Sequence, residues 1–235
     1  MKIMINLIPY EQLGGADHGW LKAKHHFSFA NYQNPHRIRF GPMRVINDDI
    51  VAPKTGFDPH PHDNMEIITY VRKGAITHKD DMGNEGRTEA GDVQVMSAGT
   101  GVVHSEYNLE NEETNLYQIW MFPNKKNVKP RWDAKQFPKE PVTDKLKPLV
   151  TGFDHPETDS LKIYQDAVIY AGRLKQGTVI KQTIKEQAYL LCSYGTFEAN
   201  DVALKKGDGA EITDLNKITI TAKSDCEVLL IDLPK

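Results

Sequence analysis

The chain has 235 residues, of which 39% are hydrophobic and 26% are charged, and its formal net charge at pH 7 is −3. This composition supports a packed core and excludes an intrinsically disordered chain. Because there is no excess of positive charge, direct binding to nucleic acid is disfavoured. The longest apolar runs, such as Tyr189–Tyr194, are far shorter than the roughly 20 residues that cross a bilayer, so we expect no membrane association.

The first residues and the cysteines bear on the cellular compartment. Residues Met1–Pro9 carry one lysine and lack the apolar core and cleavage site of a signal peptide. Cys192 and Cys226 are too few for a disulfide framework and are expected to be small buried residues on strands. These features predict a cytoplasmic protein.

Turn-forming residues recur about every 8–12 positions between short segments that alternate apolar and polar side chains, which is typical of an all-β sandwich or barrel. Helix is expected only in short pieces, around Tyr10–Gly14 or in the proline-rich segment described below. Asp80–Gly86 is dense in turn residues and predicts a hairpin loop. The expected strands are Met65–Val71, Asp92–Met96, Asn115–Phe122, Ala188–Phe197, Lys217–Ala222 and Glu227–Leu233.

Prolines are concentrated in the middle of the chain, where six of the thirteen fall between Pro123 and Ser160. Because proline removes a backbone donor, this segment is not expected to form the centre of a sheet. It predicts a linker at residues 124–160 between two β-rich halves, at 1–123 and 161–235.

Two short segments carry residues with the spacing of metal ligands. In an extended strand, residues two apart point the same way, so His60 and His62 share a face, and Glu66 has the same parity. About 40 residues later His104 and Glu106 also share a face. A lone H-x-H pair also fits two surface histidines on an edge strand, but the second pair, one hairpin away, favours a metal site. Such nitrogen and oxygen donors suit Fe(II), Mn(II), Ni(II), Cu(II) or Zn(II), and the cysteines are too few for an iron–sulfur cluster.

The remaining histidines are weaker candidates for metal ligands. His25 and His26 point to opposite faces of an extended segment, so at most one can face a site. We expect both to be exposed or satisfied by hydrogen bonds rather than bound to metal. The others lack a partner at ligand spacing and are expected at the surface: His18, His36, His78 and His155.

Taken together, these segments resemble the pirin family of the cupin superfamily. The resemblance implies a bicupin, with two β-barrels in one chain, and the distribution of the histidines predicts that only the first barrel holds a metal. No histidine follows His155, and Lys181 and Thr183 lie where a second H-x-H pair could have been. The matching residues are Gly56, His60, His62, Glu66 and Gly74 in the first cupin motif and Gly91, Ser97, Gly99, His104 and Asn108 in the second. The further matching segments are Gly19–Tyr32, Arg44–Asp49, Ser97–Asn108 and Leu116–Trp120.

The resemblance also implies a ligand set and a metal. In pirins the metal is held by residues matching His60, His62, His104 and Glu106. Other cupins use the glutamate of the first motif, so Glu66 is either the alternative ligand or a group that supports the ligands from behind. The cofactor is expected to be one divalent transition metal, Fe(II) first, with Mn, Ni, Co, Cu or Zn as alternatives.

Several bacterial pirins act as quercetin 2,3-dioxygenases, so the resemblance implies a flavonol substrate and O₂. Glu106 is then the catalytic base for the substrate hydroxyl. Phe57, Met96 and Trp120 are candidates to line the pocket, with core packing as the alternative role for each. Other pirins are iron-dependent regulators that contact a transcription factor or a metabolic enzyme, and a non-oxidative cupin such as an isomerase uses the same ligands. A closed bicupin needs no partner to cover its edges, so we expect a monomer.

Overall fold

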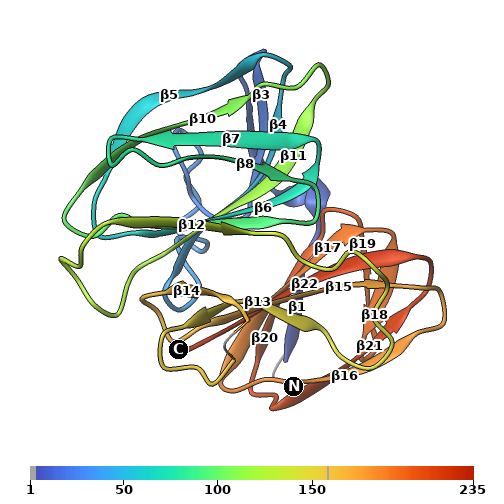
Figure 1. Cartoon of the computed structure of the whole chain (residues 1–235). Helices are drawn as coiled ribbons and strands as arrows, with labels where there is room; N and C mark the ends of the chain where they lie inside the picture. The colour runs from blue at the N-terminus through green and yellow to red at the C-terminus, as the bar shows by residue number, and fades with distance from the viewer. Residues whose placement is uncertain (1–3, 158) are drawn as a thin grey trace. The chain divides into compact units, whose positions relative to one another are not determined.

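The computed structural model describes residues 4–157 and 159–235, and nearly all of its regular elements are strands (Figure 1). Among these residues the helical element is a single 3₁₀ turn, η1 (Tyr10–Gln12), at the place where a short helix was expected. No helix in the described part of the chain has the length and hydropathy to cross a membrane. The prediction of an all-β fold is confirmed.

The chain forms two compact units. The N-terminal unit comprises Gly14–Pro138 and Leu161–Gln165, and the C-terminal unit comprises the chain up to Leu13, Lys139–Ser160 and Asp166–Lys235. These units differ from the predicted ranges of 1–123, 124–160 and 161–235. Ile5 and Leu7 pack against the core of the C-terminal unit, so the first strand pairs with a segment about 200 residues away. Such long-range pairing leaves no local signal in the sequence.

Two antiparallel sheets build the N-terminal unit, with strand orders β12-β9-β6-β11-β4-β3-β2 and β5-β10-β7-β8 (Figure 1). The predicted turn at Asp80–Gly86 is the β7–β8 hairpin. The strands are β2 (Gly14–Asp17), β3 (Leu21–His25), β4 (Met43–Val51), β5 (Thr55–His62), β6 (Glu66–Lys73), β7 (Ala75–Asp80), β8 (Glu85–Glu89), β9 (Val93–Ser97), β10 (Val102–Asn108), β11 (Thr114–Met121), β12 (Arg131–Lys135) and β14 (Leu161–Ile163).

The inner faces of these two sheets are connected by polar contacts as well as apolar ones. Val71, Ile76 and Leu116 form a buried apolar cluster between the sheets. Elsewhere, the amides of Gln94 on β9 and Gln118 on β11 donate hydrogen bonds to Glu106 on β10 of the other sheet. The interior of this unit is therefore part apolar core and part polar site.

The C-terminal unit has an apolar interior. Its strands follow the neighbour orders β1-β20-β17-β22-β15-β13 and β16-β21-β18-β19. Leu190, Ile212, Ile220 and Leu230 belong to one fully buried cluster, which also contains Cys192 and Cys226. The strands are β1 (Ile5–Ile8), β13 (Lys147–Gly152), β15 (Val168–Leu174), β16 (Val179–Thr183), β17 (Gln187–Tyr194), β18 (Thr196–Ala199), β19 (Val202–Lys205), β20 (Gly209–Thr213), β21 (Lys217–Ala222) and β22 (Cys226–Leu233).

The interpretation of Lys181 and Thr183 needs correction. Both side chains are exposed on β16, whereas Ile180 and Gln182 are the buried residues of that strand. The inward positions therefore have the opposite parity from the one assumed, although the absence of a histidine from this strand is unaffected.

The proline-rich segment contains two strands rather than a bare linker. β12 follows Pro130 and lies at the edge of its sheet, paired with β9. β13 contains Pro148, next to a shift of register in its pairing with β15. Both positions are ones that tolerate proline, because an edge or a bulge leaves a donor position unpaired.

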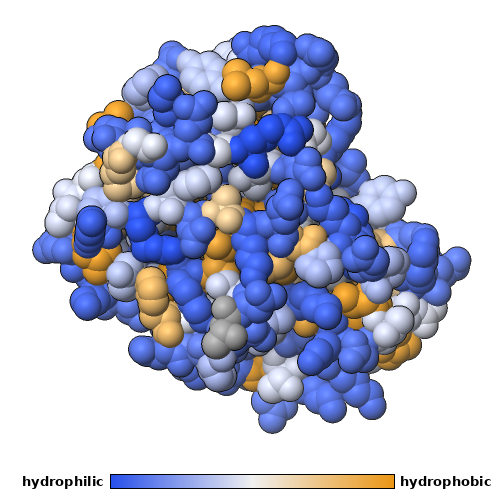
Figure 2. Space-filling view, in the orientation of Figure 1, coloured by the Kyte–Doolittle hydropathy of each residue, from blue (hydrophilic) through white to orange (hydrophobic). Residues whose placement is uncertain are grey.

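The surface is mostly hydrophilic on the face shown in Figure 2, and hydrophobic residues on it are scattered. The exposed large hydrophobic side chains of the described residues include Ile38, Val103, Leu109 and Tyr194. Scattered exposed apolar residues are normal for a folded domain and do not by themselves mark an interface.

Two residues of the second cupin motif explain the loop geometry around the polar site. Gly99 has a φ of +49°, and a Cβ there would lie 2.1 Å from the carbonyl oxygen of Val128, so only glycine fits. Asn108 is fully buried at the end of β10. Its side-chain nitrogen lies within hydrogen-bond distance of the carbonyl oxygens of Val51, Ala52 and Glu112, and its Oδ1 accepts from the backbone nitrogen of Glu110.

We expect Asn108→Ala to lower the free energy of unfolding by about 2–3 kcal/mol, because buried backbone groups lose their partners. Urea unfolding followed by fluorescence measures this change. The matched control is Asn111→Ala, an exposed position for which we expect a change of no more than about 0.5 kcal/mol. Equal stability of the two variants would contradict the proposed role of Asn108.

Candidate metal centre

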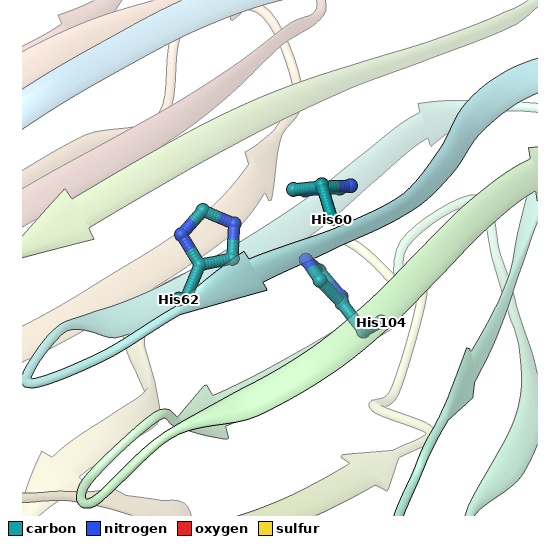
Figure 3. A group of neighbouring side chains, drawn as sticks. All are labelled: His60, His62 and His104. Atoms are coloured by element: carbon teal, nitrogen blue, oxygen red, sulfur yellow. The ribbon is translucent and has the colours of Figure 1, made fainter.

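Three histidines from two neighbouring strands meet inside the N-terminal unit. β5 contributes His60 and His62, β10 contributes His104, and His104 pairs directly with His60 in the antiparallel register. One ring nitrogen from each lies within 4.8 Å of the others, and Figure 3 shows the three rings gathered around a common space. The sequence analysis proposed these three histidines from the shared face of His60 and His62, the second pair at His104 and the family resemblance.

The hydrogen bonds of these rings leave the Nε2 atoms available as ligands. The Nδ1 of His60 donates to the carbonyl oxygen of Asp58 at 2.7 Å, so its Nε2 carries a lone pair. The Nε2 atoms of His62 and His104 are buried and have no hydrogen-bond partner among the residues that the structure describes. Buried polar atoms without partners are costly, and three imidazole nitrogens converging on one point fit a divalent transition metal.

Burial keeps two of these imidazoles in the neutral form that binds metal. Desolvation lowers the pKa of His62 to about 4, and the neighbouring His104 and His60 act in the same direction. Desolvation likewise lowers the pKa of His104 to about 3, with His60 and His78 contributing. A metal ligand must be unprotonated, so both rings are ready to bind at neutral pH.

Glu106 lies near the three histidines but is held by its own network. A register shift in β10 between His104 and Glu106 places Glu106 opposite Phe57 of β5. One carboxylate oxygen accepts from Gln94 Nε2 at 2.7 Å and the other from Gln118 Nε2 at 2.8 Å. A carboxylate has about four acceptor positions, so both oxygens keep capacity for a metal or a proton. The carboxylate is not part of the 4.8 Å cluster, and its role as fourth ligand stays a prediction.

Glu66, the alternative carboxylate, is directed elsewhere. Its oxygen accepts from Ser97 Oγ at 2.7 Å and from the backbone nitrogen of Tyr164 at 3.2 Å. Burial raises its pKa to about 7, opposed by these hydrogen bonds. The parity argument failed because β5 ends at His62 and β6 begins at Glu66, with Asn64 in the left-handed region (φ +42°) between them. Parity applies only within one continuous strand.

A cavity of about 710 Å³ opens from the histidines into the N-terminal unit. This volume is within the usual range for small-molecule sites. Phe57 and Trp120 line it, and their contact with a substrate stays a prediction. Met96 does not line it; it packs behind Ile67, a lining residue, in a buried apolar cluster. The other lining residues include Trp20, Phe29, Asn47, Asp49, Glu106 and Gln118.

His78 was wrongly predicted to lie at the surface. It is 1% exposed, its ring stacks on Trp132 at 4.9 Å, and its Nδ1 lies 3.3 Å from the Nδ1 of His104. A sequence signal existed, because His78 and Asp80 have the parity of an inward pair on one strand. The signal was missed because Asp80 was assigned to a turn.

Two further polar residues lie on the cavity wall, His25, which was expected to be satisfied by hydrogen bonds, and Asp49, which was not anticipated. His25 lies on the cavity wall, where its Nδ1 forms a 2.8 Å hydrogen bond with Oδ1 of Asn47. Asp49 is 2% exposed, and its Oδ1 has no hydrogen-bond partner among the described residues. Desolvation raises the pKa of Asp49 well above its usual value, and the charges of Asp48 and Glu106 act in the same direction. Asp49 therefore holds a proton more readily than an exposed aspartate does.

Comparisons with known proteins agree with this geometry. Residues 8–121 match the family model Pirin, and residues 153–233 match the model of the quercetinase C-terminal cupin domain. The chain is 52% identical over 231 residues to a pirin-like protein of Caulobacter vibrioides, covering 97% of this chain and 99% of that protein. It is 42% identical over 234 residues to quercetin 2,3-dioxygenase of Escherichia coli, covering 98% and 99%.

A solved structure is also similar to this chain. The crystal structure of the bacterial pirin YhhW from Escherichia coli in complex with nickel(II) superposes with a TM-score of 0.91 at 39% identity, covering 98% of this chain and 99% of that one. That protein binds a divalent metal. The chain's own histidine cluster fits a single divalent metal as well.

The two glutamates can be distinguished by matched substitutions. We expect Glu106→Gln to lower the affinity for Ni(II) at least tenfold, because the substitution removes an anionic oxygen donor beside the cluster. Glu66→Gln keeps the shape and the acceptor for Ser97, so it should change the affinity by no more than about threefold. Isothermal titration calorimetry of the metal-free proteins measures both. Loss in Glu66→Gln with retention in Glu106→Gln would assign the ligand to Glu66.

The lowered pKa values predict the pH dependence of metal binding. Above about pH 5, His62 and His104 are neutral imidazoles in the metal-free protein, so metal binding displaces no proton from them. We expect Ni(II) affinity to fall most steeply below about pH 4, where protons begin to compete for both rings. A loss of roughly a hundredfold between pH 7 and pH 5.5 would require more than one proton per metal and would contradict these values.

Proposed function

The chain belongs to the pirin family, and from this premise we propose that it is a metal-dependent dioxygenase that opens the heterocyclic ring of flavonols such as quercetin. In this reaction both atoms of O₂ enter the organic product and one ring carbon leaves as carbon monoxide. The observation that carries the proposal is the aromatic cavity of about 710 Å³ that begins at the histidine cluster. Similarity to the quercetin 2,3-dioxygenase of Escherichia coli supports it.

The proposed metal ligands are the Nε2 atoms of His60, His62 and His104, with Glu106 as the fourth ligand. When bound, a divalent metal supplies Lewis acidity, which lowers the pKa of a coordinated hydroxyl and stabilises the substrate as its anion. Fe(II) remains the first candidate, and the nickel complex of the Escherichia coli pirin supports Ni(II) as another.

Glu106 is the proposed catalytic base. Its carboxylate lines the cavity beside the histidines, and the amides of Gln94 and Gln118 each hold one of its oxygens. The hydroxyl of Thr69 also donates to one oxygen at 3.2 Å. Because all three donors are neutral, they orient the carboxylate without supplying a cation to neutralise it. Glu106 can therefore accept the proton of the flavonol hydroxyl and leave an electron-rich anion to react with O₂.

The cavity walls support a flat aromatic substrate. Trp20 and Phe57 meet edge to face at 5.1 Å, and Phe29 and Trp120 do so at 5.5 Å. All four line the cavity, so each ring is held by a neighbour before substrate arrives. The buried carboxyl group of Asp49 adds a hydrogen-bonding group to a mostly apolar surface, which suits a polyhydroxylated ring system.

The alternative function, a redox-sensing regulatory protein, requires different features of the structure. A redox-sensing protein needs a metal whose oxidation state changes a binding surface, but it needs no substrate cavity. The aromatic lining therefore favours the enzyme. If the regulatory alternative holds, oxidation of bound iron should change the affinity for a protein partner.

Anaerobic loading with Fe(II), Mn(II), Ni(II), Co(II) or Cu(II), followed by quercetin and O₂, tests the proposal. We expect at least one metal to give one carbon monoxide released per O₂ consumed. In Glu106→Gln loaded with that metal, we expect kcat to fall by about 10²–10⁴-fold, as is typical for the loss of a general base. Glu66→Gln is the control and should keep most of the activity. Absence of carbon monoxide with every metal would refute the assignment for this substrate.

A further inference from the structure

Two residues of β7 stand directly behind one of the proposed ligands. In the pairing of β10 with β7, His104 lies opposite Asp80 and Glu106 lies opposite His78. Both β7 side chains are buried on the inner face, with 1% exposure for His78 and 8% for Asp80. Neither belongs to the histidine cluster that would hold the metal.

Asp80, His78 and His104 form a series of hydrogen bonds, and the contacts of Asp80 determine which atom donates in each of them. Its Oδ1 accepts from the backbone nitrogens of Met82 at 3.0 Å and Asn84 at 2.9 Å, and its Oδ2 accepts from Asn84 Nδ2 at 2.9 Å. A carboxylate with these partners acts only as an acceptor. The Nε2 of His78, 3.0 Å from Oδ2, must therefore carry the hydrogen and donate it.

The hydrogen bond between His78 and His104 follows from the chemistry of imidazole. A neutral imidazole with a hydrogen on Nε2 has a lone pair on Nδ1. The Nδ1 of His78 lies 3.3 Å from the Nδ1 of His104, so His104 is the donor in that contact. With its hydrogen on Nδ1, His104 has a bare Nε2, which is the buried ring nitrogen without a partner among the described residues.

We propose that Asp80 and His78 are positioning residues that hold His104 in the Nδ1–H tautomer, so that its Nε2 lone pair faces the metal. The inference rests on the metal-binding part of the proposed function and is independent of the dioxygenase reaction. It assigns to an Asp–His pair the orienting role that a single carboxylate or carbonyl group plays behind most metal-bound histidines. His60 illustrates the simpler arrangement, since its Nδ1 donates directly to the carbonyl oxygen of Asp58.

Packing holds the intermediate ring in place. Trp132 stacks on His78 with an interplanar angle of 9°, so the ring cannot rotate without losing that contact. Gly86 of the neighbouring β8 makes room for Trp132, because a Cβ at this position would lie 2.3 Å from the indole. His78 is therefore fixed by a hydrogen bond at Asp80 and by an aromatic face at Trp132.

The substitution Asp80→Asn tests which atoms donate in this series of hydrogen bonds, with little change in the shape of the side chain. The backbone nitrogens of Met82 and Asn84 hold the amide oxygen in the place of Oδ1, so the amide nitrogen faces His78. It also faces the side chain of Asn84, whose amide turns over to present its oxygen in place of Nδ2. Because the introduced amide nitrogen donates, His78 must accept on Nε2 and donate from Nδ1. His104 must then accept on Nδ1 and carry its hydrogen on Nε2, which is the form that cannot bind metal.

Two readouts follow this change, the ¹⁵N chemical shifts of the His104 ring in the metal-free protein and the affinity for Ni(II) by calorimetry. We expect the Nδ1–H tautomer in the wild type and the Nε2–H tautomer in Asp80→Asn, with a 10–100-fold loss of Ni(II) affinity, about the loss seen when such supporting partners are removed. A structural role alone would not exchange the tautomer.

Substitutions of His78 separate packing from hydrogen bonding. His78→Phe keeps a ring against Trp132 but has no acceptor, so we expect about the same loss of Ni(II) affinity as in Asp80→Asn. His78→Asn can still accept from His104 through Oδ1 and should recover the affinity to within about threefold of the wild type. Thermal unfolding of the metal-free variants checks that each one folds.

The outcomes distinguish this inference from the proposed function. An Nε2–H tautomer of His104 in the metal-free wild type, or Ni(II) affinity in Asp80→Asn within twofold of the wild type, would overturn the positioning role. A wild type that binds no Ni(II) would overturn the metal site itself. Normal Ni(II) binding without carbon monoxide release would refute the dioxygenase and leave the positioning role standing.

Discussion

The N-terminal unit depends on three imidazoles, each of which brings a ring nitrogen into one partly buried space. Two of these nitrogens have no hydrogen-bond partner among the described residues, and desolvation holds the pKa values of His62 and His104 at about 4 and 3. A folded chain tolerates such groups when a metal replaces the missing partners. Much of the polar interior of the N-terminal unit, from Asp80 to Gln118, can be understood as support for this arrangement.

The two units show how one architecture accommodates different interiors. In the N-terminal unit the inward positions of β9, β10 and β11 carry Gln94, Glu106 and Gln118, which satisfy one another across the two sheets. In the C-terminal unit the corresponding space is filled by aliphatic residues such as Leu190 and Leu230. A polar interior requires every group to find a partner, whereas an apolar one requires only volume and shape.

Sequence reasoning succeeded where a residue's role depends on its neighbours along one strand. His60 and His62 share a face because they are two apart in β5, and the turn at Asp80–Gly86 follows from its own composition. It failed across breaks and between strands. Glu66 does not share a face with His62, because the strand is interrupted at Asn64. Met96 lies in a buried apolar cluster and does not line the cavity. His78 contacts His104 because their strands are paired.

By itself, the sequence determined that the chain is all-β, that its histidines are confined to one part of it, and that three of them share the spacing of a metal site. These properties are local, since they follow from composition and from the two-residue period of a strand. Only the tertiary structure decided which strands are neighbours, and so which unit the first strand joins and which carboxyl groups reach the site. Strand pairing is set by the burial of whole faces over long separations, and no short segment encodes it.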